Sequence, residues 1–149
     1  MKNIVMFLLV FAGTVTTTQA QTPVSDADKA AITQTALDYL EGWYAADGER
    51  MERALHPELA KRIMRTNAQG QSRLDQMSAM TLVHYTRRGG GKGTPKDQQQ
   101  KDITILDVFG NAATVKAVAR DWVDYLHIAK SEGRWVIVNV LWELKPKKE

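Results

Sequence analysis

The chain has 149 residues and no cysteine, and its 20 Lys and Arg against 17 Asp and Glu give a formal net charge of +3. This mild charge gives no support for a nucleic-acid partner, and the absence of cysteine excludes disulfides and lipid attachment through a cysteine. The length fits a single globular domain that must be held together by its hydrophobic core.

The first twenty residues have the pattern of a secretory signal peptide. Lys2 precedes an apolar run of nine residues, Ile4 to Ala12, and Thr18-Gln19-Ala20 places small residues before a cut at Gln21. Such a run is well short of the roughly 20 residues that span a bilayer, so we expect no stable membrane anchor. We therefore expect a secreted or periplasmic protein whose mature chain, residues 21–149, is one domain with its core at about 27–145.

The mature chain begins with a predicted amphipathic helix. Ser25 or Asp26 stands where an N-cap belongs, and Asp47-Gly48 supplies the end. Between them one side of the helix is mostly apolar and aromatic, with Ala31, Ile32, Thr35, Ala36, Tyr39, Leu40, Trp43 and Tyr44 at helical spacing. A short second helix is predicted over 49–55, and His56-Pro57 closes it.

The middle of the chain predicts a short strand, a turn and a third helix. Residues 58–66 fit the strand, 67–70 fit the turn, and the spacing of apolar residues across 72–88 indicates the helix. The glycine-rich run 87–96, RRGGGKGTPK, then ends this helix. It is not a phosphate-binding loop, because Gly93 stands where that motif needs Ser or Thr and a helix precedes it instead of a strand. We expect a mobile connection instead.

The last third of the chain is rich in β-strand formers. Segments 101–109, 112–130 and 135–144 are separated by Gly110-Asn111 and by the turn 131–134, which predicts an antiparallel meander. Helices followed by such a meander predict an α+β fold with the helices packed on one face of a curved sheet. Both faces of 135–144 are largely apolar, so we expect a homodimer formed through the outer face of the sheet.

The end of the first helix, YLEGWYAADGERMERALHPE, and the terminal hairpin, DYLHIAKSEGRWVIVNVLWE, together resemble the nuclear transport factor 2-like superfamily. The resemblance is closest to its putative lumazine-binding, SnoaL-like branch and covers nearly the whole mature chain. It implies a cone-shaped fold, with a strongly bent sheet around a long helix, a pocket between them, and the glycine-rich run near the pocket rim. Because the superfamily holds isomerases, cyclases, dehydratases and domains without known activity, the fold does not name the function.

A carboxylate base in related isomerases and cyclases lies near the strand after the second helix. Here that neighbourhood is Lys61-Arg62-Ile63-Met64, which contains no acid. The remaining candidates for an acid or base are Asp124, on a mostly apolar strand, and His56, which lies beside a proline at a helix end. The alternatives are that His56 caps the helix end or is simply exposed, and that Asp124 pairs with Arg120 or caps a backbone group.

The predicted pocket wall consists of Tyr39, Trp43, Trp122, Asp124 and Asn139. A regular register across the turn 131–134 places Asp124 and Asn139 on the same sheet face, where they could orient a ligand. A one-residue bulge would place Tyr125 and His127 in the pocket instead. The aromatic residues could stack on a flat ligand or could simply belong to the core.

No histidine spacing indicates a metal site, and no motif indicates a cofactor. Three functions remain open. The first is a binding domain for an unknown small, apolar or flat ligand. The second is an isomerase, cyclase or dehydratase that uses Asp124 or His56. The third is a structural or interaction domain that dimerises through its sheet.

Overall fold

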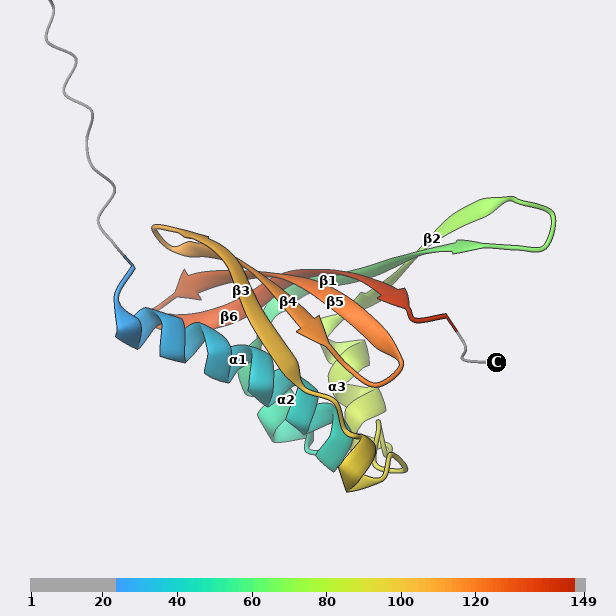
Figure 1. Ribbon diagram of the computed structural model, residues 1–149, viewed down its shortest axis with the longest axis horizontal. Coiled ribbons are helices and arrows are strands. Elements are labelled where there is room, and N and C mark those ends of the chain that lie inside the picture. The colour runs from blue at the N-terminus through green and yellow to red at the C-terminus, as the bar shows by residue number, and fades with distance from the viewer. Residues whose placement is uncertain (1–23, 147–149) are drawn as a thin grey trace, which may run out of the picture.

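The structure is a computed structural model that describes residues 24–146. The predicted signal peptide and its cleavage point lie outside the described residues. Three helices cover one face of a six-stranded sheet that curls around them without closing (Figure 1). The predicted α+β cone is therefore confirmed.

The first predicted helix is α1, Asp26–Ala45. The side chain of Ser25 caps it by accepting a hydrogen bond from the backbone N–H of Asp28. At the other end Ala46 adopts a left-handed φ of 58°, and the next residue donates its N–H to the carbonyl of Gly42. Most of the predicted side of the helix is buried, with Ile32, Thr35, Ala36, Tyr39, Leu40 and Tyr44 facing the interior, whereas Ala31 is exposed and Trp43 is half-buried.

The second helix, α2, spans Gly48–Ala54, close to its predicted range, and is followed directly by β1, Leu55–Thr66. The predicted helix over 72–88 is wrong in its first half, because Ser72–Ser78 is strand β2 and only Ala79–Arg87 is helix α3. The turn at 67–70 folds β2 back onto β1, so that Lys61 pairs with Met77. Backbone pairing along this hairpin overrides the helical spacing of its apolar residues.

The C-terminal meander contains four strands instead of the three predicted segments. These are β3 (Asp102–Phe109), β4 (Ala112–Val118), β5 (Trp122–Ser131) and β6 (Arg134–Leu144). A short turn at 119–121 divides the predicted segment 112–130. The strand order is β2-β1-β6-β5-β4-β3, and every neighbouring pair is antiparallel except β1 with β6. The parallel pair joins the β1–β2 hairpin to the meander.

A one-residue bulge lies in β6. Ile137 pairs with Ile128 and Asn139 with His127, so Val138 is the extra residue. Beyond a bulge the side chains of a strand change faces. Ile137 and Val140 are therefore both buried in the core, whereas Asn139 turns to the outer face. The predicted regular register across the hairpin is wrong beyond Ile137.

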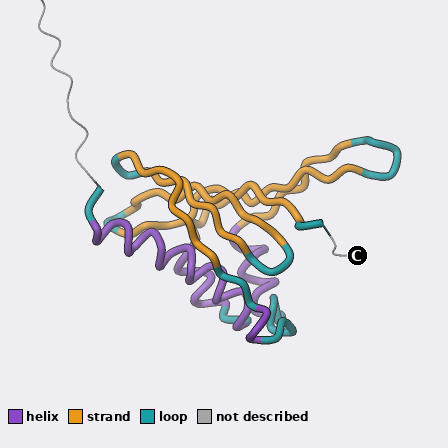
Figure 2. The backbone as a smooth tube through the Cα atoms, in the orientation of Figure 1, coloured by secondary structure: helices purple, strands orange, loops and turns teal. Residues whose placement is uncertain are grey.

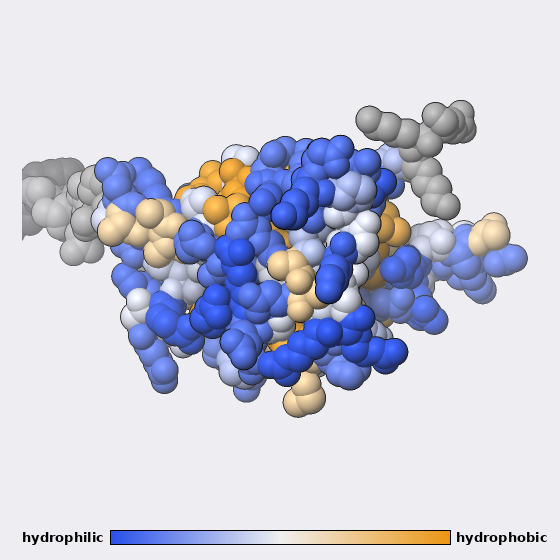
Figure 3. All heavy atoms as spheres, turned by 90° about the horizontal axis from the view of Figure 1, so that it is seen from below, coloured by the Kyte–Doolittle hydropathy of each residue, from blue (hydrophilic) through white to orange (hydrophobic). Residues whose placement is uncertain are grey.

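The helices lie together on the concave side of the sheet, and the β1–β2 hairpin projects beyond the body of the domain (Figure 2). Seen from the helical side, the surface is mostly hydrophilic, with apolar side chains visible only in places (Figure 3). Among the described helices, none has the combined length and hydrophobicity that crossing a membrane requires. The hydrophobic core thus lies between α1 and the sheet, and it leaves a hollow at the end of the cone near α3.

Candidate ligand-binding site

A cavity of about 380 Å³ opens between the C-terminal half of α1, the helices α2 and α3, and the concave face of the sheet. Its lining is mostly apolar and comes from all three α-helices, the glycine-rich run and the strands β1, β2, β5 and β6. The lining residues are Tyr39, Trp43, Met51, Lys61, Met77, Leu82, Gly90, Gly91, Thr94, Asp121, Trp122, Trp142 and Leu144.

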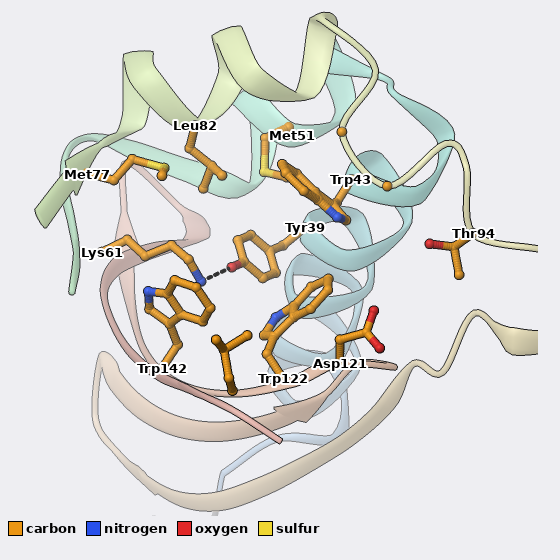
Figure 4. Close-up of a pocket in the computed structure, with 13 residues that line it drawn as sticks. Tyr39, Trp43, Met51, Lys61, Met77, Leu82, Thr94, Asp121, Trp122 and Trp142 are labelled. Atoms are coloured by element: carbon orange, nitrogen blue, oxygen red, sulfur yellow. Dashed lines mark hydrogen bonds between the residues drawn. The ribbon is translucent and has the colours of Figure 1, made fainter. Parts of the chain in front are cut away.

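Aromatic rings form much of the cavity wall. Trp43 of α1 meets Trp122 of β5 edge to face, with ring centroids 6.2 Å apart and an interplanar angle of 84°. Trp142 of β6 stands beside them on the sheet side, while Met77, Leu82 and Met51 line the opposite side (Figure 4). Rings and thioethers around a hollow of this size suit a flat, apolar molecule.

One amine stands on this apolar surface. Leu59, Lys61 and Ile63 alternate along β1 and are all buried, so the strand turns Lys61 toward the interior together with two apolar neighbours. Lys61 is only 6% exposed, and its Nζ lies 4.6 Å from the centroid of the Trp142 ring. Its Nζ donates to the hydroxyl of Tyr39 at 2.7 Å (Figure 4).

Asp124 of β5 is the counter-ion of this amine. The carboxylate has no exposed surface, and its Oδ1 accepts a hydrogen bond from Lys61 Nζ at 2.5 Å. Its Oδ2 accepts from the indole N–H of Trp122 at 2.6 Å. Across the described residues, no buried side-chain nitrogen or oxygen lacks a hydrogen-bond partner. The buried charges are therefore fully compensated, as burial of an ion pair requires.

Burial shifts the pKa values of the groups around this pair. It lowers the pKa of the Lys61 amine, and the nearby Asp124 carboxylate only partly opposes that shift. It also raises the pKa of the Tyr39 phenol well above its ordinary value, and the negative charge of Asp124 adds to the rise. Tyr39 thus keeps its proton, while Lys61 loses one more readily than a solvated lysine does.

The glycine-rich run forms one side of the cavity, near the rim as the family resemblance implied. The N–H of Gly91 donates to the carbonyl of Trp43 at 2.9 Å, and a Cβ at Gly91 would lie 2.6 Å from the Trp43 ring. Gly90 has φ of 41°, and a Cβ there would lie 2.7 Å from the same carbonyl. The glycines let the loop backbone pack directly on Trp43. The predicted mobility of the run stays a prediction.

The structure brings most of the predicted pocket residues together. Tyr39, Trp43 and Trp122 line the cavity, and Asp124 lies directly behind Lys61 without lining it. Because of the bulge in β6, Asn139 is absent from the lining. Its side-chain oxygen instead accepts from Arg62 at 2.9 Å.

The other acid–base candidate and the bulge alternatives lie outside the cavity lining as well. His56 accepts a hydrogen bond from the backbone N–H of Glu58 through Nδ1 at 3.2 Å. Tyr125 and His127 point away from the core, since β5 keeps the regular alternation that buries Asp124 and Leu126. The bulge arises in β6, so it moves Asn139 and leaves the face of Asp124 unchanged.

Sequence reasoning missed Lys61 and Trp142. The signal for Lys61 was present, since a lysine between Leu59 and Ile63 falls on the apolar side of an alternating strand. A charged residue in that position needs a buried partner, and Asp124 on its apolar strand was the matching candidate.

Within the described residues, no group of three or more His, Cys, Asp or Glu side chains could hold a metal ion.

Lys61→Met tests the importance of this ion pair for stability. The variant leaves the Asp124 charge buried without its cation, so we expect the free energy of unfolding to fall by about 3–5 kcal/mol. Adding Asp124→Asn removes that charge while keeping an acceptor for Trp122, and should restore most of the loss. Urea unfolding at neutral pH measures both values. A double variant no more stable than Lys61→Met alone would contradict the account.

The model of one protein family, described as putative lumazine-binding, matches residues 27–143 of the chain. No protein among the curated sequences matches the chain significantly. Several solved structures share its fold. An NTF2-like protein of unknown function from Methylobacillus flagellatus is 22% identical with a TM-score of 0.63, covering 85% of this chain and 98% of that chain.

Two further structures extend this comparison. An NTF2-like protein of unknown function from Shewanella baltica is 18% identical with a TM-score of 0.62, covering 85% of this chain and all of that one. A ketosteroid isomerase-like protein from Erwinia carotovora is 10% identical with a TM-score of 0.52, covering 83% of this chain and 100% of that chain. At these identities the likeness establishes the fold alone.

Proposed function

The chain belongs to the putative lumazine-binding family, within the nuclear transport factor 2-like superfamily, and we propose that it binds a flat, mostly apolar ring compound bearing a carbonyl oxygen. The observation that carries this proposal is the buried amine of Lys61, the one amine among the residues that line a cavity walled by tryptophans. The rings supply stacking surface, and the amine supplies one directional hydrogen bond.

The size and shape of the cavity support a compact ligand. Its volume of about 380 Å³ lies near the lower end of the range of roughly 300–1,000 Å³ that is usual for small-molecule sites. Trp43, Trp122 and Trp142 offer ring faces and edges to a molecule of one to three fused rings. Gly90 and Gly91 extend this surface with backbone, because a side chain there would collide with Trp43.

The electrostatics of the cavity favour a neutral acceptor over a full anion. Lys61 carries one positive charge, but Asp124 compensates it at 2.5 Å, so the buried pair has no net charge. Nζ makes hydrogen bonds to Tyr39 and Asp124 among the described residues, which leaves one of its three N–H directions for a ligand. A carbonyl oxygen accepts such a bond without bringing an uncompensated charge into the site.

The geometry gives less support to an enzyme that uses Asp124 or His56 as its base. Asp124 does not line the cavity, and both of its oxygens are already engaged, by Lys61 and by Trp122. His56 lies elsewhere, at the start of β1. A substrate in the cavity would meet Lys61 before it met either group.

Filling the cavity should weaken binding. Met77 lines the cavity, whereas Leu74 on the same strand is 51% exposed and does not. With lumazine as the probe and quenching of tryptophan fluorescence as the readout, we expect Met77→Trp to weaken binding at least about tenfold, or ~1.4 kcal/mol. Leu74→Trp is the matched control and should bind like the wild type. If wild-type protein binds neither lumazine nor other flat carbonyl compounds, the proposed function is wrong.

We further propose that the mature protein is an exported homodimer joined through the outer face of the sheet. The signal-peptide pattern of residues 1–20 supports export. Exposed apolar side chains on the outer face, among them Tyr125 at 43% and Leu141 at 52%, support the dimer. These two residues are paired neighbours on β5 and β6, so they form one continuous surface.

Native mass spectrometry of protein secreted by a bacterial host tests both proposals at once. The expected species is twice the mass of a protomer that begins at Gln21. Leu141→Arg should give the processed monomer, because it would bury an unpaired positive charge from each protomer in the apolar contact. A wild-type protein that is monomeric, or that retains residues 1–20, would refute the corresponding half of the proposal.

A further inference from the structure

Lys61 has the environment of a reactive amine as well as that of a hydrogen-bond donor. Asp124 holds it from behind, Tyr39 holds it from the cavity wall, and it faces a cavity that is otherwise mostly apolar. A solvated lysine is a poor nucleophile because it is protonated, whereas a lysine in an apolar pocket gives up its proton more easily. The proposed ligand-binding function uses only the donor property of this amine.

We propose that Lys61 is a carbonyl-reactive amine that condenses with aryl aldehydes entering the cavity to form an imine. This inference rests on the proposed function, since the same aromatic walls must hold the aryl ring. It narrows the ligand class from ring compounds with an acceptor oxygen to ring compounds with an electrophilic carbonyl carbon.

The first requirement is an acceptor for the proton of the amine. Oδ1 of Asp124 lies 2.5 Å from Nζ, so the proton can move to the carboxylate within an existing hydrogen bond. This transfer turns two buried charges into two neutral groups, which a dry environment favours. A ligand that displaces water from the cavity increases this preference, and the burial of Lys61 already lowers the pKa of its amine.

The protons and charges of the condensation are then all accounted for by Lys61, Asp124 and the aldehyde. The neutral Nζ attacks the carbonyl carbon, the C=O π electrons move to oxygen, and a proton from nitrogen reaches that oxygen to give a carbinolamine. Asp124 returns its proton to the hydroxyl, which leaves as water while the nitrogen lone pair forms the C=N bond. The products are one water molecule and a protonated imine that is paired with the Asp124 carboxylate, so the charges of the starting pair are preserved.

Tyr39 is suited to position the oxygen during these steps. Its hydroxyl lies 2.7 Å from Nζ, and its raised pKa keeps the phenol protonated. A protonated phenol can donate to the carbonyl oxygen of an aldehyde whose carbon lies next to Nζ. Trp142, whose ring centroid lies 4.6 Å from Nζ, stabilises the cationic nitrogen both before and after condensation.

Reductive trapping tests this proposal on the wild-type protein. The protein is incubated at neutral pH with 2-naphthaldehyde and cyanoborohydride, and peptide mass mapping locates the naphthylmethyl groups. We expect Lys61 to be modified at least about tenfold faster than the exposed Lys29 and Lys92, because the cavity walls hold the aldehyde next to Nζ and burial lowers the pKa of this amine. The Met77→Trp variant should lose this selectivity, and Leu74→Trp should keep it.

Protection by 2-naphthamide is a second measurement that needs no variant. This amide matches the ring but cannot condense, so excess amide should slow modification of Lys61 and leave Lys29 and Lys92 unaffected. Lys61→Met, where it folds, should carry no rapidly formed adduct.

Modification of Lys61 no faster than that of the surface lysines overturns the carbonyl proposal. Quenching of tryptophan fluorescence by 2-naphthamide and by lumazine then decides whether the proposed binding function stands. If either compound binds, the proposed binding function stands without the reactive amine, and if neither binds, both proposals fall.

Discussion

The buried ion pair between Lys61 and Asp124 is the interaction on which the candidate site depends. It joins β1 to β5 across the concave face, and the hydroxyl of Tyr39 connects it to α1. Such a pair is costly to desolvate and needs complete hydrogen bonding, which Trp122 and Tyr39 supply. A pair of apolar residues could hold the same three elements together, so the polar groups are better explained by the cavity that Lys61 faces.

Much of the fold follows from local patterns in the sequence. The apolar stripe from Ile32 to Tyr44 and its caps predict α1, because residues three or four positions apart lie on the same face of a helix. The turns at 110–111 and 131–134 predict the meander because β-hairpins need residues that adopt positive φ, as Gly110 and Gly133 do. The aromatic end of α1 likewise predicts that Tyr39 and Trp43 line a pocket.

Other features depend on contacts between distant segments. The helical spacing of 72–88 misleads because pairing with β1 decides the structure of Ser72–Ser78. The bulge at Val138 has no local sequence signal, and it alone moves Asn139 out of the predicted site. Lys61 could have been recognised from its apolar neighbours on β1, but its partner is 63 residues away in the chain.

Both roles proposed for Lys61 require an amine that is buried beside Asp124 and faces the cavity. An NMR pH titration with ¹³C-labelled lysine, assigned by comparison with Lys61→Met, measures its pKa directly. We expect a pKa for Lys61 below those of the exposed lysines, because burial lowers it, and a further decrease in Asp124→Asn, because the carboxylate charge raises it. A Lys61 pKa equal to or above those of the exposed lysines would contradict the account.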